Sequence, residues 1–85
     1  MTSKEAYELA VAYNQLAVKL QIVKGTNSLS LENLVKAQYF SDLAMMTFLT
    51  EIPLVEDLQK SVANILADTS ITISENIRFF EAKKA

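Results

Sequence analysis

Residues 39–49 constrain the fold more than any other part of the chain, because eight of these eleven residues are apolar. At about 100° per residue, eight apolar side chains cannot share one face of a helix. A helix that is apolar on every side must be covered, either by its own chain or by another molecule. The stretch is therefore expected to be core, subunit interface or partner site.

Few residues in the chain favour turns. The chain has 85 residues, of which 51% are hydrophobic, and it contains one glycine and one proline. Long helices follow from the scarcity of turn residues, and the short length indicates a single domain over residues 1–85. Oligomerisation often supplies part of the core in chains of this size. The predicted fold class is all-α, with an antiparallel helical hairpin and a long third helix assembling as a helical-bundle homodimer.

The residue types that carry most enzyme and metal chemistry are missing. The chain contains no cysteine and no histidine. This removes disulfides, thiolate sites, and the usual general base and metal ligand. The eight Lys and Arg residues are scattered and the net charge is −2, which disfavours direct binding of nucleic acid. We expect no enzyme activity, metal or cofactor.

The N-terminal residues and the apolar run bear on localisation. The first residues lack the uninterrupted apolar segment of a signal peptide. The apolar run of the second helix is broken by Asp42, Glu51 and Pro53, short of the roughly 20 residues that a spanning helix needs. These features favour a cytoplasmic protein without a membrane span.

Helix 1 is expected over residues 3–24. Thr2 and Glu5 have the spacing of a capping box, and Gly25 suits a helix C-terminus. One apolar seam alternates steps of three and four residues: Ala6, Leu9, Tyr13, Leu16, Leu20 and Val23. A second stripe lies roughly opposite: Tyr7, Val11, Val18 and Ile22. Two apolar sides exceed what one neighbouring helix covers, which favours a dimer.

Helix 2 is expected over residues 31–51. Ser30 is the favoured N-cap, and Ser28 is the alternative. A loop of about five residues after helix 1 predicts antiparallel packing of the two helices. The first half of helix 2 has a polar side, whereas the second half is expected to be enclosed. Pro53 ends the helix, because proline lacks an amide and clashes with the preceding turn.

Helix 3 is expected over residues 53–83. Its apolar seam repeats every eleven residues: Val55, Leu58, Val62, Leu66, Thr69, Ile73, Ile77 and Phe80. Residues 69–74 are β-branched or hydroxylic and have low helix propensity, so a break there with a short fourth helix is the alternative. Continuity is favoured because the repeat crosses the segment in phase.

Aromatic, methionine and aliphatic positions outside a simple seam are the candidate site residues. They are assigned to a partner-binding or dimer interface: Tyr7, Val11, Val18, Ile22, Tyr39, Phe40, Met45, Met46, Phe48, Phe79 and Phe80. Methionine and aromatic side chains at helical spacing also suit a core. The outer stripe of helix 1 and the Phe79 side of helix 3 are the first places to look for a functional surface.

The predicted function is that of a non-enzymatic protein–protein interaction module acting through a helical surface, as an adaptor, inhibitor or small chaperone. Short, acidic, cysteine-free helical chains of this kind are similar to accessory proteins of phages, mobile elements or secretion systems. The alternative is a small helical regulatory subunit of a nucleic-acid-processing or other multiprotein complex, without direct DNA contact. Either reading implies a protein partner.

Overall fold

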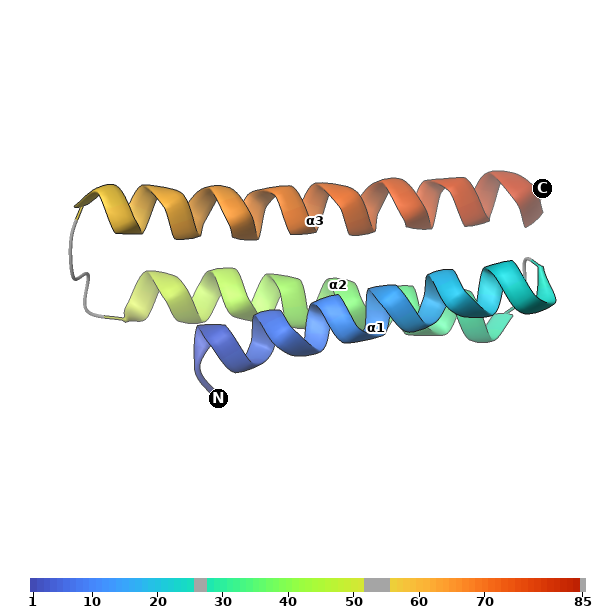
Figure 1. Cartoon of the computed structure of the whole chain (residues 1–85), viewed down its shortest axis with the longest axis horizontal. Coiled ribbons are helices and arrows are strands. Elements are labelled where there is room, and N and C mark those ends of the chain that lie inside the picture. The colour runs from blue at the N-terminus through green and yellow to red at the C-terminus, as the bar shows by residue number, and fades with distance from the viewer. Residues whose placement is uncertain (26–27, 52–55, 85) are drawn as a thin grey trace.

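The computed structural model describes residues 1–25, 28–51 and 56–84, and these residues form three helices without a strand. The helices are α1 (Ser3–Lys24), α2 (Ser28–Thr50) and α3 (Glu56–Lys84). Figure 1 shows α1 and α3 running in the same direction, with α2 antiparallel to both. The all-α prediction and the helix 1–helix 2 hairpin are confirmed.

Helix α1 begins and ends as its local sequence predicts. The Glu5 amide donates to the Thr2 hydroxyl at 3.2 Å, and the Thr2 amide donates to the Glu5 carboxylate at 3.1 Å. Gly25 follows the helix with φ 73° and ψ −168°, and its amide donates to the Gln21 carbonyl at 2.8 Å. That positive φ needs glycine, because a Cβ would be strained there.

The buried face of α1 differs from the expected seam. Ala10 and Ala17 are fully buried with Ala6, whereas Leu16 is 45% and Val23 is 78% exposed. The predicted seam is therefore wrong for Leu16 and Val23. The centre of the buried face of α1 is rotated from that seam toward Ala10 and Ala17. Small side chains on α1 meet Ala37, Ala44 and other small residues on α2, so the two helices approach closely.

Helix α2 begins earlier than expected. Its first residue is Ser28, so the alternative N-cap at Ser28 is also inside the helix, and Ser30 is fully buried on the same face as Leu34 and Ala37. The N-cap expected at Ser30 is therefore wrong, since the small side chain belongs to the packed face. The helix ends at Thr50, one residue before the expected end. Residues 52–55, which include Pro53 and the expected start of helix 3, lie outside the described residues.

Helix α3 is continuous through residues 69–74, which confirms the expectation from the eleven-residue repeat. Ile73 is fully buried, and Leu66 and Phe80 are buried on either side of it. The polar residues between them have partners: the Ser74 hydroxyl donates to the Gln38 side-chain oxygen at 3.0 Å, and the Gln38 amide donates to the Ser70 hydroxyl at 3.4 Å. Tertiary packing thus overrides the low propensity of this segment.

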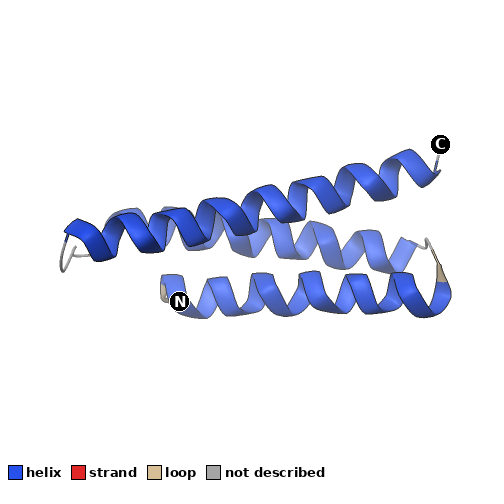
Figure 2. Cartoon of the chain, turned by 45° about the horizontal axis from the view of Figure 1, so that its top comes forward, coloured by secondary structure: helices blue, strands red, loops and turns tan. Residues whose placement is uncertain are grey.

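The core is a row of three small clusters along the long axis. Each combines small or apolar residues of α1 and α2 with one large residue of α3, which is Leu66, Ile73 or Phe80. Helix α3 packs mainly on α2 and meets α1 at few points. Figure 2 shows the three rods lying along one another. The fold therefore leaves one side of α1 and one side of α3 facing each other without close packing.

Ser3 and Glu51 join the start of α1 to the end of α2. The Ser3 amide and hydroxyl each donate to a Glu51 carboxylate oxygen at 2.8 Å. The backbone bond, and after it the hydroxyl bond, lowers the pKa of the Glu51 carboxyl. A lowered folded-state pKa means that this contact stabilises the fold above about pH 4.5, the ordinary value, and is lost as the pH falls through the lowered pKa.

We expect Glu51→Gln to lower the thermal midpoint at pH 7, because a neutral amide accepts weaker hydrogen bonds than a carboxylate. The difference from the unmodified chain should shrink toward zero as the pH falls through the lowered pKa of Glu51. Thermal unfolding followed by circular dichroism from pH 7 to pH 3 measures this. A difference between the two chains that stays constant over this range would contradict the contact.

The central cluster gives a stability prediction. Ile73→Ala removes a fully buried side chain and should lower the free energy of unfolding by about 2–5 kcal/mol. Ile71→Ala is the control, since Ile71 is 56% exposed on the same helix, and should change it by only about 0.5 kcal/mol. Urea unfolding at one protein concentration compares them, and equal midpoints would contradict the packing described for α3.

Candidate functional site

The candidate residues divide into two groups by exposure. Those packed within their own chain are Tyr7, Val11, Phe40, Met45, Phe48 and Phe80, of which Phe80 is buried and the others half-buried. Those exposed to solvent are Val18, Ile22, Tyr39, Met46 and Phe79. Only the second group offers most of its surface to another molecule.

The run at residues 39–49 is split between core and surface. Phe40 stacks on Tyr13 with ring centroids 5.6 Å apart, and Met45 and Phe48 pack against the cluster of Ala6, Ala44 and Leu66. In contrast, Tyr39 is 63% and Met46 65% exposed. The expectation that the second half of helix 2 is enclosed is therefore wrong for one copy of the chain, because α1 and α3 cover only the side that faces them.

Apart from Leu29 in the first turn, the exposed large apolar residues of α2 form a regular row, which we call the α2 stripe: Val35, Tyr39, Met46 and Leu49. Together with exposed Asp42 they follow steps of four, three, four and three residues, so they share one helix face. That face is opposite the buried one, which carries Leu34, Ala37 and Ala44. Sequence reasoning missed Val35 and Leu49, although their seven-residue spacing from Asp42 was a usable signal.

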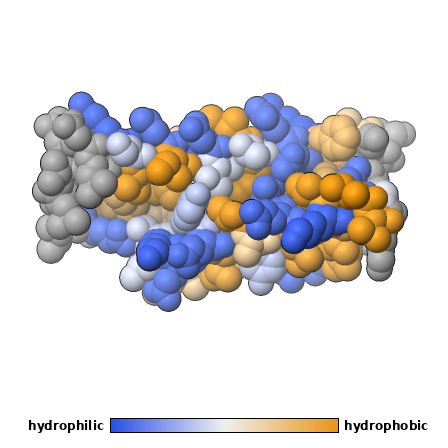
Figure 3. All heavy atoms as spheres, in the orientation of Figure 1, coloured by the Kyte–Doolittle hydropathy of each residue, from blue (hydrophilic) through white to orange (hydrophobic). Residues whose placement is uncertain are grey.

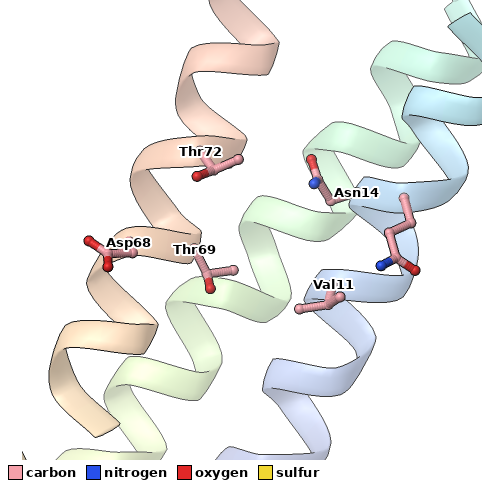
Figure 4. Close-up of a pocket in the computed structure, with 6 residues that line it drawn as sticks. Val11, Asn14, Asp68, Thr69 and Thr72 are labelled. Carbon is pink, nitrogen blue, oxygen red and sulfur yellow. The ribbon is translucent and has the colours of Figure 1, made fainter. Parts of the chain in front are cut away.

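A shallow cleft lies between α1 and α3. Its volume is about 210 Å³, and Val11, Asn14, Gln15, Asp68, Thr69 and Thr72 line it. Figure 4 shows Val11 and Asn14 of α1 on one side, with Thr69 and Thr72 of α3 on the other. At its end the Asn76 side-chain amide donates to the Asn14 side-chain oxygen at 2.9 Å, which ties the two helices together.

The sides of this cleft continue as apolar rows. Val18 and Ile22 lie seven and eleven residues after Val11 on the same face of α1, and Phe79 lies seven residues after Thr72 on α3. Val11 and Thr72 both line the cleft, and α1 and α3 run in the same direction. Seven residues farther along each helix, Val18 and Phe79 therefore lie at a similar level. Figure 3 shows apolar surface gathered over the C-terminal half of α1.

Titratable groups do not converge on either surface. In the part of the chain that the structure describes, no three Asp or Glu residues lie close enough together to hold a metal ion. Within the same residues, no helix has an apolar run long enough to cross a membrane. The two surfaces can bury apolar area and form a few hydrogen bonds, which is the chemistry of macromolecular binding.

Comparisons with protein-family models, with curated proteins and with solved structures find no match to this chain.

Met45 and Met46 are adjacent residues with different surroundings, which allows a direct test of the exposed face. Met46 is 65% exposed and Met45 is half-buried against the core, so dilute hydrogen peroxide should oxidise Met46 several-fold faster. Peptide mass spectrometry of samples at low protein concentration measures both rates. Equal rates, or faster oxidation of Met45, would contradict the orientation of α2.

Proposed function

We propose that this protein is a non-enzymatic protein–protein interaction module that presents a helical surface, as an adaptor, inhibitor or small chaperone does. It assembles as a homodimer through the α2 stripe. The observation that carries this proposal is the exposure of four large apolar side chains in one row, directly opposite the core. Contiguous exposed apolar surface of this kind marks interaction sites.

The spacing of the α2 stripe suits a second helix. Alternating steps of four and three residues are the pattern by which one helix seats its side chains between those of another. Burying an apolar side chain completely contributes roughly 1.5–3 kcal/mol, and these side chains retain about half or more of their surface for a partner. A second copy of α2 supplies the same row in return, as a two-fold interface requires.

Asp42 selects the direction of pairing. In a parallel pair, Asp42 would lie beside the partner's Asp42, and like charges would repel. In an antiparallel pair centred between residues 40 and 41, Val35 lies beside the partner's Met46 and Tyr39 beside the partner's Asp42. The Tyr39 hydroxyl then donates to the partner's Asp42, so the carboxylate is hydrogen-bonded rather than opposed.

The non-enzymatic part of the proposal is supported by composition. Without histidine or cysteine, the chain lacks the residues that most often act as general base or activated nucleophile. The exposed surfaces instead carry aliphatic, aromatic and methionine side chains, which repack against partners. Helical surfaces of this composition bind other helices.

Met46→Glu should convert the dimer to a monomer, because it replaces an apolar side chain of the α2 stripe with a second negative charge beside Asp42. Ile71→Glu is a matched control, because Ile71 is also an exposed helix residue. Each new carboxylate lies one helical turn from an existing acid, which is Asp42 for Met46 and Glu75 for Ile71. Sedimentation velocity at micromolar concentration measures the mass. An unmodified chain that is monomeric throughout, or loss of the dimer with Ile71→Glu, would contradict the proposal.

Tyr39→Phe tests the antiparallel arrangement. It keeps the ring and removes the hydroxyl that reaches the partner's Asp42, so the dimer should dissociate roughly tenfold more readily. Asp42→Asn in the same background should then have little further effect on the dimer, since the hydroxyl that Asp42 meets across the interface has already been removed. Independent, additive losses would show that these two side chains do not meet across the interface.

A further inference from the structure

We infer that the cleft between α1 and α3 is a second binding site, which accepts a basic amphipathic helix of a different protein. The site consists of the cleft itself and the apolar rows that continue it, with Val18 and Ile22 on α1 and Phe79 on α3. This inference rests on the proposed role as an interaction module but uses a different surface from the α2 stripe.

The geometry of the three helices leaves room for a fourth. Helix α2 packs against both neighbours, whereas α1 and α3 meet at few points on the side away from α2. Val11, Asn14 and Gln15 of α1 line one side of the cleft, and Asp68, Thr69 and Thr72 of α3 line the other. A helix lying here would bury the exposed faces of Val18 and Phe79 and complete a four-helix bundle.

The length of the apolar rows fits an ordinary helix. Along α1 the row extends from Val11 to Ile22, and along α3 it extends from Ile65, which is 49% exposed, through Thr72 to Phe79. At about 1.5 Å per residue, the α3 row of fourteen residue steps is about 21 Å long. An occupant of four to five helical turns would span it.

Charge identifies the chemistry of the occupant. The α3 side of the site carries two exposed carboxylates, Asp68 and Glu75, which lie seven residues apart on the same face. The α1 side carries Lys4, Glu8 and Lys19, which leave one positive charge, so the net negative charge of the site is confined to its α3 side. A helix with an apolar face and Lys or Arg at a seven-residue spacing toward α3 complements this pattern, and an acidic helix would be repelled.

The same charges disfavour a second copy of this chain as the occupant. The apolar row outside the site that another copy could insert is the α2 stripe, which has Asp42 at its centre. Inserting it would bring Asp42 toward Asp68 and Glu75 in a partly desolvated site. A partner with cations at these positions avoids that repulsion and gains two charge pairs.

The experiment uses the full chain and two synthetic helical peptides of about 18 residues. Both peptides carry the same apolar face, and one has lysines and the other glutamates at the flanking positions. Fluorescence anisotropy at low salt should show the lysine peptide binding about tenfold or more tightly, with the difference shrinking as salt is added. Equal affinities, or tighter binding of the glutamate peptide, would overturn the inference.

Two pairs of variants locate the site. Val18→Gln/Phe79→Gln removes apolar surface from the site without adding charge and should weaken binding of the lysine peptide about tenfold or more. Leu16→Gln/Ile71→Gln changes two exposed residues of the same two helices outside the site and should leave binding unchanged. Asp68→Asn/Glu75→Gln should remove most of the preference for lysine over glutamate. Equal affinities for the two apolar double variants would overturn the inference.

A footprint separates this inference from the proposed dimer. Amide chemical-shift changes on adding the lysine peptide should fall on Val11, Val18, Thr72 and Phe79, and should persist in Met46→Glu. Changes confined to Tyr39 and Met46 would overturn the second site, because the peptide would then occupy the α2 stripe. A monomeric unmodified chain that still binds the lysine peptide at the cleft would contradict only the dimer.

Discussion

The close contact between α1 and α2 determines the rest of the structure. Ala6 and Ala10 of α1 are fully buried in clusters with Ala44 and Ala37 of α2, and Ala17 is fully buried in a cluster with Leu34. Small side chains let two helix axes approach, and the approach leaves little space for larger α1 side chains at these positions. Leu16 and Val23 are consequently placed to one side of α1, and Val18 and Ile22 to the other. The exposed apolar surface is a direct result of building the hairpin from alanine.

Helix α3 is held differently, and this difference explains the cleft. It inserts Leu66, Ile73 and Phe80, one into each cluster, and adds hydrogen bonds from Ser70 and Ser74 to Gln38 of α2. Large side chains hold their helix farther from its neighbours than alanines do. Toward α1, the contact includes a hydrogen bond between Asn14 and Asn76 beside the threonine-lined opening.

Much of this arrangement could be predicted from local sequence signals. The capping box at Thr2, the glycine end of α1 and the continuous seam of α3 follow from rules that act within one helix. The phase of α1 could not be predicted in the same way, because alanine is a weak hydrophobic signal beside Leu16 and Val23. Its burial depends on small residues on α2, which is information about a pair of helices. The α2 stripe could not be predicted for the same reason. Val35 and Leu49 are exposed because the opposite face of α2, with Ala37 and Ala44, is the one that packs inward.

The carboxylates give the two surfaces distinct roles in the proposed function. If the α2 stripe of one copy fitted the cleft of the next, the contact would be heterologous, and such contacts form open chains unless the rotation closes a ring. A protein with two apolar surfaces is therefore exposed to uncontrolled assembly. Asp42 on the stripe and Asp68 and Glu75 beside the cleft place like charges in that contact. In the proposed antiparallel pair, Asp42 instead accepts a hydrogen bond from the partner's Tyr39. The same acid that blocks the open chain thus fits the closed dimer, which leaves the cleft free for a partner of opposite charge.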